Sequence, residues 1–173
     1  MNLVEAALGV AGVLTAISLV GALVAPRTVR PAVVGAGTAL GGVAGVVAGA
    51  AALSGQGLSV VLPGLLPLAG VLLTVDALSG VFVVVVGAVA VAVGIYGIGY
   101  ARNGLGGRGA QAMVPLFVVA MLLVPIAGSA GTFLLCWELM ALASLLLVLA
   151  QHRSRDEVAS AARWYAAPIT ARI

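Results

Sequence analysis

Five stretches of this chain are almost purely apolar, and each is long enough, or nearly so, to cross a lipid bilayer. They cover about residues 3–25, 32–53, 78–100, 111–128 and 130–151. A helix rises about 1.5 Å per residue, so about 20 apolar residues span a hydrocarbon layer of about 30 Å. The 173 residues are 63% hydrophobic and only 8% charged, whereas soluble domains carry about 25% charged residues. We therefore predict an all-α membrane protein with about five transmembrane helices.

The basic residues predict how these helices are oriented. All eight are arginines: Arg27 and Arg30 follow the first stretch, Arg102 and Arg108 follow the third, and the other four lie in the tail 152–173. With five alternating spans, the three clusters fall on one side, and Lys and Arg collect on the cytoplasmic side of membrane proteins. We expect the N-terminus outside and the C-terminus in the cytoplasm, in a multi-pass protein of the cell's inner (plasma) membrane. Arginines placed between spans form no folded basic face, so we expect no nucleic-acid partner.

The remaining segments suggest a simple domain organisation. Residues 58–73 are apolar, but two prolines and two glycines interrupt them, and they are short for a span. We predict an extended or re-entrant segment packed on the outer face. Residues 1–151 then form one helical bundle with the lipid bilayer around it. Residues 152–173 form a short interfacial tail in the cytoplasm, where Trp and Tyr suit the headgroup region.

The second stretch carries a glycine every four residues, at Gly37, Gly41, Gly45 and Gly49. Small residues at this spacing let a neighbouring helix approach closely in a membrane. We predict that these glycines line one face and pack against another helix.

Catalytic and metal-binding patterns are missing from the sequence. One His and one Cys occur, sixteen residues apart, and the Gly-rich run GLGGRG lies in a loop between two spans. A dinucleotide-binding fingerprint requires a strand before it and a helix after it. We expect no metal, no cofactor and no catalytic residues in this chain.

One charged residue stands out within a span: Glu138, in GTFLLCWELMALASLLLVLAQ. A charge at the centre of a membrane helix costs about 2.5–3.5 kcal/mol on insertion scales, and such residues usually mark an ion or proton path. The alternative is a neutral glutamic acid that only hydrogen-bonds a neighbouring helix. Two secondary candidates are weaker. Asp76 suits a helix N-cap, and His152, about 21 Å along the axis from Glu138, suits a solvated helix end.

The segment CWELMALASLLLVLAQ resembles the fifth-helix signature of the antiporter-like proton-translocating membrane subunits. That family includes large membrane subunits of NADH–quinone oxidoreductase, multisubunit cation/proton antiporters, and the membrane subunits of hydrogenase-4 and formate hydrogenlyase, to which the likeness is greatest. The core of the likeness is Trp137–Glu138–Leu139–Met140 with Ser144. LTVDALSG, MVPLFVVAMLLVPIAG and RWY are also similar to family segments, so the resemblance covers most of 70–166.

The resemblance implies a role for Glu138 that this chain does not complete. In the family, this glutamate pairs with a lysine on a broken seventh helix and controls its protonation. The present sequence contains no lysine. We therefore expect an N-terminal fragment, truncated or split from a proton-translocating subunit, that does not work alone. Its partners would be other membrane subunits of a redox-driven, hydrogenase-like or dehydrogenase-like complex, in which it would be at most a non-redox subunit.

Two other interpretations stay open at the level of sequence. The chain could be a small proton-coupled exporter, in which an oligomer brings several Glu138 side chains around a substrate. It could also be a non-catalytic membrane assembly protein, in which the glycine ladder is the working feature.

Overall fold

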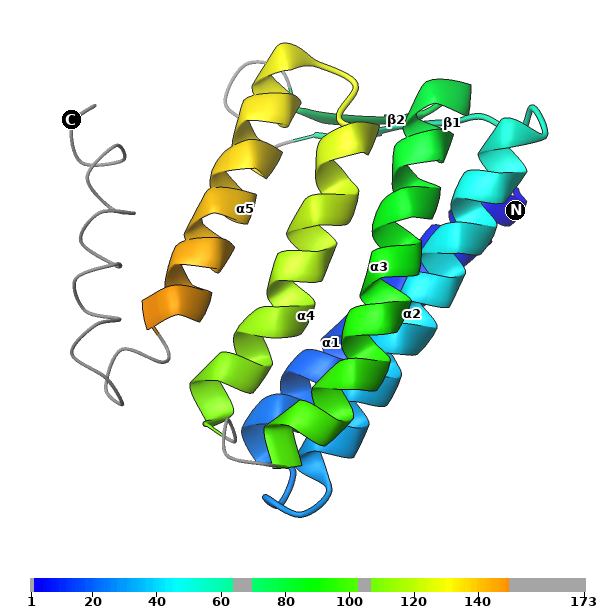
Figure 1. Cartoon of the computed structure of the whole chain (residues 1–173). Helices are drawn as coiled ribbons and strands as arrows, with labels where there is room; N and C mark the ends of the chain where they lie inside the picture. Colours follow the sequence, from blue (N-terminus) through cyan, green and yellow to red (C-terminus); the bar gives the residue numbers. More distant parts are fainter. Residues whose placement is uncertain (1, 64–69, 103–106, 150–173) are drawn as a thin grey trace, which may run out of the picture.

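The computed structural model describes residues 2–63, 70–102 and 107–149, and it is mostly helical (Figure 1). In chain order the elements are α1 (Leu3–Val24), α2 (Arg30–Leu53), β1 (Leu58–Leu62), β2 (Val71–Val75), α3 (Ala77–Arg102), α4 (Arg108–Leu123), the 3₁₀ helix η1 (Val124–Ile126) and α5 (Ala130–Leu149). Within the described ranges, five helical segments are long and apolar enough to span a membrane, the fourth running through η1. The prediction of a mostly helical chain with five segments able to span a membrane is confirmed for these ranges, while the side on which each end lies stays a prediction.

The helices run up and down, so the connections gather at two opposite ends (Figure 1). One end carries the α1–α2 and α3–α4 connections; these connections and the helix ends that flank them hold four of the eight arginines. The other end is covered by the strands β1 and β2, which lie across the tops of the helices. We call these the arginine end and the hairpin end.

The strands form an antiparallel hairpin, with Leu58 opposite Val75 and Leu62 opposite Val71. This confirms that part of 58–73 is extended. Hydrogen bonds fasten β2 to the start of α5: Gly128 N–H donates to the Leu72 carbonyl at 2.8 Å, and Leu72 N–H donates to Thr132 Oγ1 at 3.0 Å. Thr132 has no exposed surface. The hairpin thereby provides hydrogen-bond partners for backbone N–H and C=O groups that would find none in the hydrocarbon layer.

Helices α2 and α3 pack with their backbones almost in contact along a glycine seam. A Cβ atom built on Gly42 would lie 2.6 Å from the Gly87 carbonyl oxygen, and one on Gly87 would lie 2.7 Å from the Gly42 oxygen. The glycines above and below repeat this arrangement. The three facing pairs are Gly35–Gly94, Gly42–Gly87 and Gly49–Gly80. Each helix therefore contributes a glycine every seven residues.

The predicted four-residue ladder does not line a single contact. All four glycines are buried, but Gly37 and Gly41 face α1, Gly45 lies near α3 and α4, and Gly49 faces α3. A step of four residues turns a helix by about 40° beyond a full circle, so the ladder winds round the helix. A step of seven falls short of two turns by only about 20°, which keeps glycines on one seam. The interpretation of one common face is wrong for this reason.

Helix α5 lies at the edge of the bundle (Figure 1). Its main helical neighbour is α4, with further contacts to β2 and η1. Its buried residues are Thr132, Cys136 and Ala143, which follow one stripe of the helix. The opposite face of α5 is covered by no other element of the described chain.

Candidate functional site at Glu138

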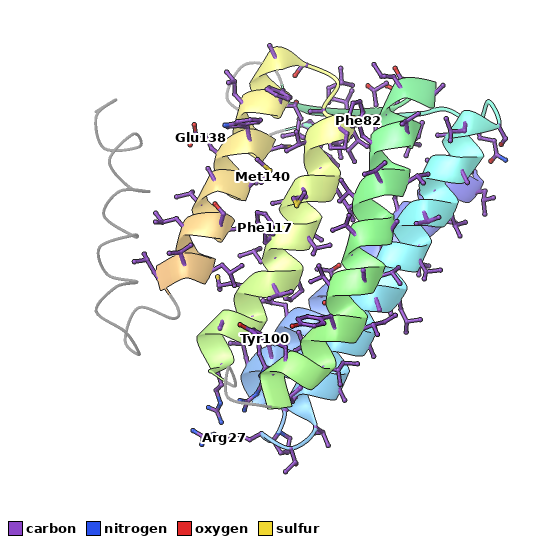
Figure 2. All side chains as sticks on the ribbon, in the orientation of Figure 1. Arg27, Phe82, Tyr100, Phe117, Glu138 and Met140 are labelled. Atoms are coloured by element: carbon purple, nitrogen blue, oxygen red, sulfur yellow. The ribbon has the colours of Figure 1, made fainter. Side chains whose placement is uncertain are left out.

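Glu138 lies in the ninth position of the twenty-residue helix α5. At about 1.5 Å per residue, it is about 12 Å from one end of the helix and about 16 Å from the other. The carboxylate is thus near the middle depth of a membrane-spanning segment. Figure 2 shows its side chain on the outer side of α5, directed away from α4 and the other helices.

The side chain of Glu138 is exposed on the surface of the bundle. Among the described residues, no other element covers this side chain. The reason is helical geometry: Glu138 follows buried Cys136 by two residues, which turns it by about 200° from the face that packs on α4. Apolar residues surround it on every side in the sequence, so hydropathy does not reveal which face is covered.

The surface around Glu138 is apolar and partly aromatic. Leu134 and Leu142, one turn to either side, are 60% and 48% exposed. Phe133 and Trp137 form an aromatic pair with ring centroids 5.8 Å apart, and both are exposed. We call Phe133, Leu134, Trp137, Glu138 and Leu142 the outer face of α5.

Glu138 has no charge partner among the described residues. No hydrogen bond or ion pair joins it to any side chain in residues 2–63, 70–102 and 107–149, and those ranges hold no group of three metal-binding side chains. Among the described arginines, Arg27 and Arg108 lie at the arginine end rather than at the depth of Glu138; Figure 2 shows Arg27 there. An isolated carboxylate at this depth is energetically unfavourable if it faces lipid.

Asp76 has a local structural role. Its Oδ1 accepts a hydrogen bond from Ser79 N–H at 2.7 Å, while Asp76 N–H donates to Ser79 Oγ at 2.9 Å. This reciprocal pair caps the first turn of α3, as expected of an N-cap residue. The hydrogen bonds from the Ser79 side chain and backbone hold the pKa of the Asp76 carboxyl below its usual value.

The structure does not bring Asp76 and Glu138 together into one site. Asp76 lies at the hairpin end, at the start of α3, and no hydrogen bond or ion pair joins it to Glu138. His152 and the predicted tail 152–173 lie outside the described residues, as do Gly104 and Gly106 of the glycine-rich loop.

A cavity of about 380 Å³ at the arginine end was not predicted from the sequence. It lies among α2, α3, α4 and α5, and its lining includes the polar side chains of Thr38, Tyr100 and Gln111. Each of these residues lies in a different apolar helix, so no single segment of the sequence contains the set. The one sequence signal was the pair of arginine connections at the same end.

Comparison with known proteins shows homology over most of the chain. The uncharacterized protein Rv0083 of Mycobacterium tuberculosis (strain H37Rv) is 52% identical over 139 residues. The uncharacterized protein MT0090 of the strain CDC 1551 matches to the same extent. The match covers 80% of this chain but only 22% of each relative. The chain thus spans about a fifth of the relatives' length, and no protein-family profile matches it.

Proposed function

We propose that this chain is a membrane-embedded part of a proton-translocating subunit, in which Glu138 binds and releases the transported proton. The observation that carries the proposal is the unpartnered carboxylate at mid-depth on the outer face of α5. The cost of about 2.5–3.5 kcal/mol for a charge at this depth falls if a protein or a water-filled path covers it. The presence of a glutamate at this depth therefore favours a proton-handling role.

The proposal includes a covering partner for the outer face of α5. The exposed leucines and aromatic rings around Glu138 form an apolar surface that a further helix can pack against. In the antiporter-like family that the segment 136–151 resembles, a lysine on a later helix pairs with this glutamate. This chain has no lysine, so the cation would come from additional polypeptide. More than three quarters of each relative lies outside the match and offers room for such helices.

Orientation and partners follow from the same proposal. The arginine end would face the cytoplasm, since positive residues collect there, and the hairpin end would face outward across the inner (plasma) membrane. The partner subunits would belong to a redox-driven complex of the hydrogenase-like or dehydrogenase-like type, with this chain contributing no redox centre.

The decisive experiment measures redox-driven proton uptake into inverted membrane vesicles from the native cells. Glu138→Gln keeps the size and hydrogen-bonding capacity of the side chain but cannot bind a transported proton. We expect it to remove the proton uptake that depends on the chain, as judged against vesicles lacking the chain. Glu138→Asp should retain part of it. Glu5→Gln, which removes a carboxylate near the hairpin end, is the matched control and should leave uptake unchanged. Normal uptake with Glu138→Gln would refute the proposal.

A second measurement separates the partner-dependent proposal from the exporter alternative. The exporter is favoured by one observation, the exposed Phe133–Trp137 pair beside Glu138, because two copies meeting at this face would enclose two glutamates and four aromatic rings. A photo-crosslinker at Leu142 should then join two copies of the chain, whereas the proposed subunit should crosslink to a different polypeptide. Proton flux through the isolated chain in liposomes, lost in Glu138→Gln, would also favour the exporter.

A further inference from the structure

The cavity at the arginine end is apolar along most of its wall. It is bounded by the first turns of α2 and α4 and the last turns of α3 and α5, and its lining includes Val34, Val93, Gly97, Val114 and Leu147. Figure 2 shows Tyr100, which lines it and is 53% exposed, in front of α3 and α4 toward the end that carries Arg27. Tyr side chains are enriched at the level of lipid headgroups. The cavity therefore extends from the interfacial zone into the hydrocarbon zone.

Two buried polar atoms of the cavity wall have no hydrogen-bond partner among the described residues. They are Thr38 Oγ1 and Gln111 Oε1, in side chains that are 3% and 6% exposed. Buried polar groups are normally paired, and an unpaired one costs about 1–3 kcal/mol. Gln111 lies about one helical turn from Arg108, and Thr38 lies about two turns from Arg30. The polar atoms thus occur at increasing depth below the arginines.

The helix ends next to the cavity are strongly positive: Arg30 precedes Pro31, which lines the cavity, and Arg108 lies two residues before Ala110, which also lines it. Arg30 is 1% exposed, its Nη2 donates to the Ala25 carbonyl at 2.7 Å, and its Nε has no partner among the described residues. Arg27 and Arg108 are near enough for their charges to act on Arg30. The three carboxylates of the described chain lie elsewhere: Glu5 and Asp76 at the hairpin end and Glu138 at mid-depth.

Backbone groups add to the attraction for an anion. Helix α4 begins at Arg108 without a side chain that caps its first turn. At the start of α2, Arg30 N–H already donates to the Pro26 carbonyl at 3.0 Å, and Pro31 has no N–H. The N–H groups of a helix's first turn have no acceptor within the helix and donate readily to phosphate oxygens. Three arginines, the uncapped first turn of α4 and an apolar cavity beside them are the complement of an anionic headgroup and its chain.

We propose that this cavity binds one anionic phospholipid. Its phosphate lies among Arg27, Arg30 and Arg108, its glycerol and ester groups lie between the depths of Gln111 and Thr38, and one acyl chain fills the deeper part of the cavity. A hydroxyl of the headgroup or an accompanying water donates to Gln111 Oε1, and an ester carbonyl accepts from Thr38. Basic pockets between helices on the cytoplasmic side are a known means of holding anionic lipids. This site is independent of Glu138 and of the proposed proton transport.

The test compares two lipids with identical chains, dioleoyl phosphatidylglycerol and dioleoyl phosphatidylcholine, by native mass spectrometry of the full chain released from detergent. We expect one phosphatidylglycerol to be retained and phosphatidylcholine to dissociate. Arg27→Gln and Arg108→Gln should each weaken phosphatidylglycerol binding about fivefold, as expected for an arginine near an anionic lipid. Both side chains are exposed, so neither replacement disturbs the core. Glu5→Gln, at the opposite end, changes the net charge by one unit in the other direction and should leave the retention of phosphatidylglycerol unchanged.

The acyl-chain part of the proposal has its own variant. Gly97 lines the cavity, and a Cβ atom built on it meets no atom within 4 Å. Gly97→Leu should therefore fill the cavity without a clash and abolish the retention of phosphatidylglycerol. Gly99→Leu is the matched control, because Gly99 also has open space around its Cβ but lies on the exposed side of the same helix. It should retain the lipid.

The outcomes of these experiments are distinguishable. Preferential retention of phosphatidylglycerol, lost in Gly97→Leu but not in Gly99→Leu, supports the proposal. Equal retention of the two lipids overturns it, and so does equal behaviour of the two leucine variants. Displacement of the lipid by millimolar inorganic phosphate, with no effect of Gly97→Leu, would show a free-anion site and would also overturn it. A self-association that blocks lipid binding would assign the cavity to a second copy instead.

Discussion

At the scale of single residues, the two carboxylates singled out from the sequence have different surroundings. Asp76 lies within reach of backbone donors three residues away, so its role follows from local sequence. Glu138 lies in the middle of a helix whose backbone donors are all used, so its role depends on what covers the outer face of α5. The first can be assigned from neighbouring residues, whereas the second requires the packing of other helices.

The capping role of Asp76 predicts the effect of two replacements on thermal stability in detergent. Asp76→Ala removes the acceptor for Ser79 N–H and should lower the melting temperature by about 2–4 °C. Asp76→Asn keeps an acceptor at the same place and should recover most of that loss. Equal melting temperatures of the Ala variant and the wild type would contradict the capping role.

The charge of Asp76 predicts a pH dependence of stability. Hydrogen bonds from Ser79 lower the pKa of this carboxyl below its ordinary value of 3.8. The folded state therefore favours the ionised form, so the stabilisation is fully present above about pH 4 and is lost as pH falls through the lowered pKa. Between pH 5 and pH 3, the difference in melting temperature between wild type and Asp76→Asn should shrink. A difference that is constant over this range would exclude the linkage.

At the scale of elements, the tightest association in the bundle is the glycine seam between α2 and α3. Its seven-residue spacing places the backbone of one helix against that of the other at three levels. Close backbone approach is how membrane helices gain packing energy without a hydrophobic force between them. The hairpin that connects these two helices ends beside the same seam, so the α2–α3 pair forms the centre of the described fold.

Two adjacent glycines of α2 provide a matched test of this seam. A Cβ atom at Gly42 would lie 2.6 Å from a backbone oxygen of α3, whereas at Gly41 the nearest atom is 3.6 Å away. Gly42→Ala should push the helices apart and lower the free energy of unfolding by about 1–3 kcal/mol. Gly41→Ala should be neutral or stabilising by up to about 1 kcal/mol, because alanine favours the helix. Unfolding measured in mixed micelles distinguishes the two, and a greater loss at Gly41 would favour the four-residue ladder instead.

At the scale of the whole molecule, charge and backbone polarity are separated between the two ends. Four arginines lie in the connections and flanking helix ends at one end, while the hairpin at the other end contains no Lys or Arg. This asymmetry is the kind that orients a bundle in the membrane. It also places the proposed lipid site on the side where anionic lipids give the cytoplasmic leaflet its negative surface potential.

The orientation is testable with single cysteines in a Cys136→Ala background. Thr28→Cys and Ser59→Cys both replace exposed hydroxyl residues, the first at the arginine end and the second in the hairpin. We expect a membrane-impermeant maleimide to label Ser59→Cys in intact cells and to label Thr28→Cys only after the membrane is opened. The reverse pattern would place the arginine end outside and would move the proposed lipid site to the other leaflet.

Composition and periodicity alone predicted five helices able to span a membrane, with an extended segment before the third, and the described residues bear this out. An apolar run of about twenty residues crosses a bilayer as an α-helix, because every backbone group must then be hydrogen-bonded within the segment. The N-cap at Asp76 was also readable, since its partner lies three residues away. These features are local, and local sequence contains the information for them.

Only the tertiary structure decided which faces of the helices meet. Nearly every position in α5 is apolar, so hydropathy could not tell that Cys136 packs inward and Glu138 outward. The same ambiguity hid the glycine seam, because α2 has glycines at both four- and seven-residue spacings and only α3 selects between them. The cavity joins Thr38, Gln111 and Gly97 from three helices. In a uniformly apolar chain, helix rotation is set by contacts between distant segments, and no single segment contains that information.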